Sequence, residues 1–360
     1  MLTTVRLRHA ALIVCLTLAV AGVDARQQHL SVLTSSPFES YLESLRLQAG
    51  IPGMSAVLVQ DGQIVWERGF GFQNQEARVR ATPDTPYPIA DMSQTLAAVL
   101  VLQCAEQRKL NIDDLARHFG IALPESSATV RQILSHTSAG TPGETFRYDP
   151  ERYSQLTQVI ESCVPQPYRK TIAVNVLERL AMNDSVPGRD LADPNALTER
   201  LFADAVLERY RRVLDRVAIP YKVDKRARAT RNEVAVEGIN AATGLVTTVR
   251  DFARFDAALD NALLLREETL QVAWSNATNS QQTALPMGLG WFVQSYRGEP
   301  VVWHFGLIPS AYSSLVVKLP ARHLTFILFA NSEGLNSTFL PEPGDVTRSL
   351  FATLFLRLYT

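Results

Sequence analysis

The sequence is poor in the residues that bind metal ions. Its 360 residues include 3 cysteines and 6 histidines, and none of them lie at a spacing typical of a metal site. The chain also lacks an excess of charge of either sign, because its formal net charge is −1. We therefore expect no metal ion, no other cofactor and no nucleic acid as a partner.

Cysteine is too scarce to build a disulfide framework. Cys15 lies in an N-terminal apolar run, which leaves Cys104 and Cys163 in the body of the chain. Both fall in segments predicted to be helical, and two small buried side chains are the simpler interpretation. Because an exported protein is permitted a disulfide, the sequence leaves open whether the two cysteines pair.

One apolar run near the N-terminus predicts export. Residues 10–21 follow the basic residues Arg6 and Arg8, and Ala25 ends a pattern of small residues suited to cleavage. The run is too short to cross a bilayer. We expect residues 1–25 to be a signal peptide and the mature protein to be periplasmic or secreted. An uncleaved N-terminal anchor is the alternative.

The rest of the composition, 46% hydrophobic and 20% charged, is that of a globular protein. Apolar residues at helical spacing predict helices, and short alternating segments between turn residues predict strands. The predicted helices cover residues 38–49, 94–108, 130–137, 151–163 and 345–359; a hairpin is predicted over 54–72 and strands over 288–296, 300–306, 313–319 and 324–331. Prolines interrupt residues 165–235, which are predicted to be helical and irregular.

Strands therefore open and close the chain, and helices fill its middle. This order predicts an α/β protein of the α+β type, with one antiparallel sheet built from both ends of the chain. We expect a single domain over residues 26–360, with a sheet lobe from about 38–85 and 240–360 and a helical lobe from about 86–239. The cleft between the lobes is the expected site.

Short motifs spread over residues 38–358 occur in the order seen in one known family. They are Gly50-Ile51-Pro52-Gly53, Asp61-Gly62, Leu134-Ser135-His136-Thr137-Ser138, Ala242-Thr243-Gly244-Leu245, Asp251-Phe252-Ala253-Arg254-Phe255 and Gly288-Leu289-Gly290-Trp291. Together they resemble the β-lactamase-related serine hydrolases, which include class C β-lactamases, low-molecular-weight penicillin-binding proteins and esterases. The resemblance implies the fold of that family and its active-site cleft.

The first catalytic motif of this family is Ser-x-x-Lys at the start of a helix, where the lysine helps to take the proton of the attacking serine. Here Asp91 stands at the serine position and Gln94 at the lysine position. A carboxylate is a poor nucleophile for acyl transfer because it would form a mixed anhydride. An amide cannot accept a proton at neutral pH. The resemblance therefore implies the fold but puts the hydrolytic activity in doubt.

The second and third motifs are partly kept. Tyr148 occupies the general-base position of a Tyr-x-Asn motif, whose asparagine position is Pro150. His304 and Gly306 fit a Lys/His-Thr-Gly motif, whose threonine position is Phe305. In the family, the backbone N–H of the serine position forms an oxyanion hole with that of the position now held by Leu307.

Asp91 has a structural interpretation, because a carboxylate at a helix start is stabilised by free backbone N–H groups. We expect its side chain to fill the place of a substrate oxyanion and to accept a hydrogen bond from Tyr148 or His304. Ser93 is a candidate displaced nucleophile, but its place on the helix turns it away from the cleft if Asp91 faces in. Ser135, His136 and Ser138 resemble a serine–histidine pair, and in the family's frame they belong to a structural turn.

Two further features bear on binding. Residues 209–231 contain nine lysines and arginines against Asp215 and Asp224, which suggests either a solvated surface or contact with an anionic envelope surface. In the segment 303–308, the apolar residues Phe305, Leu307 and Ile308 make the cleft more apolar. An apolar cleft fits either a collapsed site or a pocket for an apolar ligand.

Three hypotheses follow for the function. The first is an inactive, exported member of the family that acts by binding a small molecule, a peptide or an envelope ligand in the cleft, or by regulation. The second is an esterase, D-alanyl peptide hydrolase or β-lactam hydrolase with altered machinery that uses Tyr148, His304 and an unidentified nucleophile. The third is an envelope scaffold that uses residues 209–231. The sequence leaves the oligomeric state open.

Overall fold

The computed structural model describes residues 37–193, 201–336 and 344–360. The chain divides into two compact units, residues 1–44 and 45–360. The described part of the first unit is the beginning of helix α2 (Glu39–Gln48), which agrees with the helix predicted over 38–49. The predicted signal peptide lies outside the described residues. Within those residues, every helix is too short or too polar to span a bilayer.

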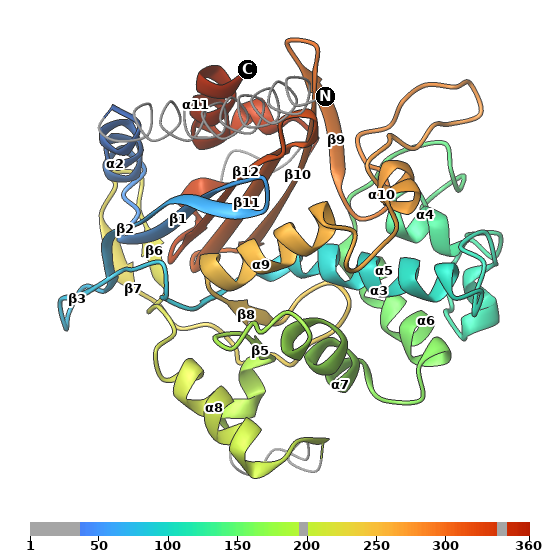
Figure 1. The fold of residues 1–360 in the computed structure, drawn as a ribbon, viewed down its shortest axis with the longest axis horizontal. Helices are drawn as coiled ribbons and strands as arrows, with labels where there is room; N and C mark the ends of the chain where they lie inside the picture. Colours follow the sequence, from blue (N-terminus) through green and yellow to red (C-terminus); the bar gives the residue numbers. More distant parts are fainter. Residues whose placement is uncertain (1–36, 194–200, 337–343) are drawn as a thin grey trace, which may run out of the picture. The chain divides into compact units, whose positions relative to one another are not determined.

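A seven-stranded antiparallel sheet organises the second unit (Figure 1). Its strands, in spatial order, are β3 (Val79–Arg80), β2 (Gln63–Asn74), β1 (Gly53–Gln60), β12 (Leu324–Ala330), β11 (Tyr312–Leu319), β10 (Glu299–Ile308) and β9 (Phe292–Tyr296). The two ends of the chain meet where β1 pairs with β12, with Met54 opposite Ala330 and Gln60 opposite Leu324. This pairing confirms the predicted sheet.

Helices cover both faces of this sheet. Phe326 and Phe329 of β12 point to opposite faces because they are three residues apart on a strand. Phe326 stacks on Phe355 of α11 (Leu350–Tyr359), with ring centroids 5.3 Å apart. Phe329 meets Phe252 of α9 (Val249–Asp260) edge to face, at 5.9 Å. Helices α9 and α11 therefore bury opposite faces, as Figure 1 also shows.

Helix α3 (Gln94–Glu106) is the core of the helical part. It is buried from Gln94 to Leu102 and again at Cys104, which agrees with its hydrophobic sequence on all sides. Helices α6 (Leu156–Cys163) and α7 (Tyr168–Ile172) pack against it. Further helices are α4 (Val130–Leu134), α5 (Pro150–Ser154), α8 (Asp204–Leu214) and α10 (Glu267–Ala273). The predicted helix over 151–163 is thus two helices, α5 and α6, and the one over 130–137 ends three residues early.

The middle of the chain contains strands that the sequence did not predict. One small sheet has the order β4 (Tyr87–Pro88), β8 (Leu245–Thr247) and β5 (Val186–Pro187). A separate hairpin joins β6 (Tyr221–Val223) to β7 (Ala229–Arg231). Its turn is held by Asp224, whose carboxylate accepts from the N–H groups of Arg226 and Arg228. Such Asx turns are hard to distinguish from irregular helical loops by composition alone.

Candidate functional site

Asp91 lies in a 3₁₀ turn, Ala90–Ser93, that leads directly into α3. Ala90 enters the turn with a φ of 49°, a left-handed value that is uncommon for alanine. The turn aims the Asp91 carboxyl group at β10, where Oδ2 accepts a hydrogen bond from the backbone N–H of Leu307 at 3.4 Å. The carboxyl group also bonds to the N–H of Asp91 itself. The two N–H groups expected to bind an oxyanion are therefore occupied by the side chain of Asp91.

Gly306 is needed for this geometry. A Cβ atom at this position would lie 1.9 Å from the carbonyl oxygen of Ile89 and 2.5 Å from Oγ of Ser314. Ser314 in turn donates to the Ile89 carbonyl at 2.8 Å. The glycine thus lets β10 approach the turn that carries Asp91, which is a packing requirement independent of any reaction.

Gln94 belongs to a hydrogen-bonded chain with two residues of the helical part. His136 donates from Nε2 to Oε1 of Gln94 at 2.9 Å, because its Nδ1 must accept from the N–H of Asp149, also at 2.9 Å. The amide nitrogen of Gln94 then donates to the hydroxyl oxygen of Tyr148 at 3.3 Å. The histidine is therefore a neutral Nε2–H tautomer, and each polar group of Gln94 has a matched partner.

Tyr148 sits in an aromatic cluster. Its ring stacks on His136 at a centroid distance of 4.5 Å and contacts Phe305 at 5.4 Å and Phe292 at 5.8 Å. Burial, together with the nearby negative charge of Asp91, raises the pKa of Tyr148 well above its usual value. The phenol therefore stays protonated at neutral pH, and Phe305, at the threonine position of the third motif, fills space in this cluster.

The ionisable groups of the site favour their neutral forms. Burial raises the pKa of Asp91 to about 7 although the N–H groups of Leu307 and Asp91 oppose the shift. Burial also lowers the pKa of His136 to about 3, with a further contribution from nearby His304, and lowers the pKa of His304 to about 4. The two histidines therefore stay uncharged at neutral pH, whereas Asp91 is partly ionised there.

Two of the predicted contacts of Asp91 are wrong. Among the described residues, neither Tyr148 nor His304 donates to its carboxyl group. Tyr148 is engaged by Gln94, and Nδ1 of His304 donates to the carbonyl oxygen of Phe305 at 2.7 Å. Nε2 of His304 is buried and has no hydrogen-bond partner in the described part of the chain. The expected filling of the oxyanion site therefore occurs through backbone N–H groups.

Pro150 also has a structural role. It is the first residue of helix α5, where its missing N–H costs nothing, and Asp149 caps the helix by accepting from the N–H of Arg152 at 3.1 Å. The asparagine of the second motif has thus been replaced by a residue that starts a helix. No side-chain donor or acceptor remains at this position.

The serine candidates are committed to local structure. Ser93 is 1% exposed; its Oγ donates to the Ala90 carbonyl at 2.7 Å and accepts from the Leu245 N–H at 3.3 Å. Ser135 bonds to the Arg131 carbonyl and to Thr137, both at 3.0 Å, and makes no bond to His136. Ser138 is also buried, and its carbonyl accepts from Arg152 at 3.2 Å. These positions agree with the structural interpretation.

Cys104 and Cys163 are free thiols on α3 and α6, the first buried and the second half-buried. Their side chains are hydrogen-bonded neighbours, and Cys163 also donates to the Val159 carbonyl at 3.4 Å. The interpretation as two small packed side chains therefore agrees with this structure.

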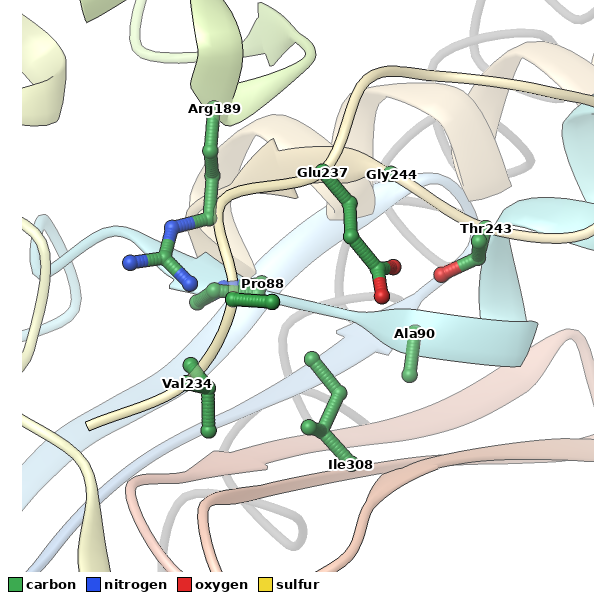
Figure 2. A pocket seen from close by; sticks show the side chains of 9 residues that line it. Pro88, Ala90, Arg189, Val234, Glu237, Thr243, Gly244 and Ile308 are labelled. Atoms are coloured by element: carbon green, nitrogen blue, oxygen red, sulfur yellow. The ribbon is translucent and has the colours of Figure 1, made fainter. Parts of the chain in front are cut away.

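A cavity of about 220 Å³ adjoins the Asp91 site. Ala90 and Ile308, which line it, are the chain neighbours of Asp91 and Leu307. Its lining consists of Pro88, Ala90, Arg189, Val234, Ala235, Glu237, Thr243, Gly244 and Ile308. Figure 2 shows the side chains of Arg189, Glu237 and Thr243 around this space, with Val234 and Ile308 on another side of it.

Sequence reasoning missed three residues of this region. His136 lies in the turn to which it was assigned, but its hydrogen bond to Gln94, 42 positions earlier in the chain, was not predicted. Arg189 and Glu237 lie in the irregular middle of the chain, and no motif marks them. The Leu134-Ser135-His136 motif was the feature of the sequence that could have pointed to His136. Arg189 and Glu237 are far apart in the sequence, so only the folded structure shows that they lie together.

Comparison with known proteins is consistent across sequence and structure. The family model named Beta-lactamase matches residues 36–345. A curated relative, Protein flp of Staphylococcus aureus strain MW2, is 22% identical over 336 residues; the match covers 82% of this chain and 62% of the relative. This chain thus spans less than two thirds of the length of that relative.

Two solved structures share the fold. The penicillin-binding protein homologue from Pyrococcus abyssi, described as octameric, superposes with a TM-score of 0.69 at 23% identity, over 82% of this chain and 73% of that chain. EstCE1, described as a hydrolase with promiscuous acyltransferase activity, superposes with a TM-score of 0.67 at 14% identity, over 92% of this chain and all of that chain. At these identities the likeness concerns the fold.

Proposed function

Because this chain belongs to the β-lactamase family, we propose that it is a member in which ligand binding or regulation has replaced hydrolysis. The scaffold of the family is complete around the cleft, while the groups that would attack an acyl carbonyl and carry its proton have been exchanged. The observation that carries this proposal is the position of the Asp91 carboxyl group on the N–H groups of Asp91 and Leu307.

An acyl substrate would need those N–H groups. Acyl transfer develops negative charge on the carbonyl oxygen, and backbone donors that meet this charge supply a large part of the rate. A substrate oxygen would first have to displace the Asp91 side chain, which is itself an anion when ionised. The occupied donors therefore support a site that does not bind a transition state for acyl transfer.

The proton-transfer groups support the same proposal. Gln94 offers an amide in place of an amine, and the amide cannot take up a proton near neutral pH. Tyr148 is held as a neutral phenol by burial and by the negative charge of Asp91, because both raise its pKa. A protonated phenol cannot accept a proton from a nucleophile.

The test compares the natural chain with Asp91→Ser/Gln94→Lys. Both proteins are treated with a fluorescent penicillin and with chromogenic esters, and Tyr148→Phe in each background is the control. We expect the natural chain to remain unlabelled and to hydrolyse no ester above the rate of its Tyr148→Phe variant. Replacing a nucleophile and its partner typically removes several orders of magnitude in rate.

The hydrogen-bonded chain at Gln94 calls for one further variant. A lysine at position 94 would face the Nε2–H of His136, and this proton cannot move to Nδ1 because Nδ1 accepts from Asp149. Two donors would then oppose each other. We therefore add Asp91→Ser/Gln94→Lys/His136→Gln, whose amide oxygen can accept from the new lysine. Thermal unfolding of each variant separates loss of fold from loss of activity.

The outcomes decide between the first two hypotheses. A silent natural chain with labelling in either restored variant would support the binding function. Ester or penicillin turnover by the natural chain, abolished by Tyr148→Phe, would overturn it in favour of a hydrolase with altered machinery. The acyl adduct could then be trapped to identify the nucleophile.

We also propose that the protein acts outside the cytoplasm, on the basis of the apolar run at residues 10–21 behind Arg6 and Arg8. Contact of residues 209–231 with an anionic envelope surface is a further proposal. Several arginines there already have partners: Arg212 pairs with Glu208 at 2.8 Å and Arg228 pairs with Asp224 at 2.9 Å. Salt-dependent binding to anionic vesicles would test this contact.

A further inference from the structure

The cavity beside Asp91 carries two opposite charges without ion-pair partners. Arg189 and Glu237 both line it, and within the described residues neither side chain forms a salt bridge. Thr243 adds a hydroxyl group that makes no hydrogen bond in the same part of the chain. Figure 2 shows the side chains of all three among the residues that line the cavity. Charged groups directed into a concave site without partners are available to a ligand.

A backbone hydrogen bond holds Arg189 and Glu237 next to each other. The N–H of Arg189 donates to the carbonyl oxygen of Glu237 at 3.1 Å, so the two residues are fixed side by side. The next residue, Asp190, accepts two hydrogen bonds from Arg169, at 2.7 and 2.6 Å. This ion pair lies close to Gly238, whose added Cβ would be 2.9 Å from Arg169. The segments that carry Arg189 and Glu237 are thus tied together.

The remaining lining is apolar and the space is small. Pro88, Val234 and Ile308 contribute hydrocarbon surface. The volume of about 220 Å³ lies below the 300–1,000 Å³ typical of pockets for drug-sized ligands. A ligand that matches the site therefore has a carboxylate, an ammonium group and a compact apolar group.

We propose that this cavity binds a free α-amino acid with an aliphatic side chain. The guanidinium group of Arg189 pairs with the ligand carboxylate, Glu237 pairs with the ammonium group, and Pro88, Val234 and Ile308 contact the side chain. Two opposite charges on one small ligand are matched by two opposite charges on the wall. This inference rests on the proposed function, because it names the ligand class of the same cleft.

The experiment measures binding of leucine to the natural chain by calorimetry, with both enantiomers tested. N-acetyl-leucine lacks the ammonium charge and leucinamide lacks the carboxylate. We expect leucine of one or both hands to bind, and each derivative to bind at least about tenfold more weakly, because each leaves one wall charge unpaired.

The variants assign each charge. In Arg189→Gln, leucine should lose at least about tenfold in affinity and the preference for leucine over leucinamide should disappear. In Glu237→Gln, the preference for leucine over N-acetyl-leucine should disappear. Arg226→Gln and Glu233→Gln are the matched controls, because both residues are exposed and neither lines the cavity.

Three results would overturn the inference. They are the absence of leucine binding up to about 10 mM, equal binding of leucine and its two derivatives, and equal losses in the control variants. These results are independent of hydrolysis. A chain that binds leucine but also cleaves an ester keeps this site and loses the proposed function. A chain that does neither keeps the proposed function and loses this site.

Discussion

Two ionisable side chains, the buried Lys318 and the half-buried Asp91, are stabilised in contrasting ways. Lys318 of β11 is 3% exposed. Its ammonium group donates to Asp256 at 2.9 Å, to Asp260 at 2.8 Å and to Thr325 at 3.0 Å. Among the residues that the structure describes, the partners of the Asp91 carboxyl group are the N–H groups of its own backbone and of Leu307.

The pKa values follow this difference. Burial alone would lower the pKa of Lys318, but the charges of Asp256 and Asp260 outweigh it and raise the pKa. Burial raises the pKa of Asp91 to about 7 because two backbone dipoles do not replace the lost hydration of a carboxylate. A full counter-charge thus keeps a buried group ionised, whereas isolated dipoles leave the Asp91 carboxyl group only partly ionised at physiological pH.

The largest expected effect comes from removing the paired cation. Lys318→Met leaves the carboxylates of Asp256 and Asp260 buried without their partner. We expect the free energy of unfolding near pH 7 to fall by about 3–5 kcal/mol, measured by urea denaturation. Lys225→Met, at an exposed position, is the control and should change stability by less than about 0.5 kcal/mol. An equally small loss in Lys318→Met would show that the contrast with Asp91 is wrong.

The second prediction concerns the poorly compensated anion. The pKa of Asp91 is about 7 in the folded protein, against 3.8 as its ordinary value. Between these values the folded state binds more protons than the unfolded state, so this group contributes stability at low pH that is lost as pH rises through about 7. Asp91→Asn removes this titration and should be more stable than the natural chain by roughly 2–4 kcal/mol at about pH 8.5.

The measurement is urea denaturation of both proteins from about pH 4.5 to about pH 8.5. The advantage of Asp91→Asn should be level above about pH 7.5 and should shrink as the pH is lowered further. Lys225→Met provides a pH-independent reference at an exposed position. An advantage that stays constant across this range would mean that the carboxyl group of Asp91 is not held in an anion-poor environment.

The third and smallest effect belongs to His136. Its burial makes the free energy of unfolding rise with pH, whereas that of Asp91 makes it fall. Its pKa is lowered to about 3 in the folded protein, from 6.5. Its contribution is therefore present above about pH 6.5 and lost as pH falls. His136→Gln breaks the bonds to Gln94 and Asp149, and we expect a loss of about 1–3 kcal/mol at about pH 7.5 and a smaller loss at about pH 5. Thermal unfolding at both values provides the measurement, and a larger loss at the lower pH would contradict it.

Much of the fold was predictable because its signals are local. Alternating strands at both ends of the chain predicted the sheet, and the all-round hydrophobic sequence of α3 predicted its burial. The β6–β7 hairpin was missed because its strands have three residues each and its turn depends on Asp224. Strands this short carry almost no periodicity.

The sequence predicted where the candidate site lies better than it predicted the hydrogen bonds within the site. The motif around Asp91 located the two backbone N–H groups of the oxyanion site, because the motif spacing determines which residues contribute them. The partners of Gln94 could not be inferred, because His136 and Tyr148 reach it only after α3 has packed against distant segments. The backbones of Arg189 and Glu237 come together for the same reason.

The hydrogen-bonded network of Asp149, His136, Gln94 and Tyr148 has a consequence for the evolution of the site. Each donor faces an acceptor, so a single change of Gln94 back to lysine would place two donors together, and Pro150 would still be the first residue of its helix. Restoring the Ser-x-x-Lys motif of the family at positions 91 and 94 therefore needs several simultaneous substitutions. If hydrolysis has been lost as we propose, this hydrogen-bonded network makes the loss hard to reverse one residue at a time.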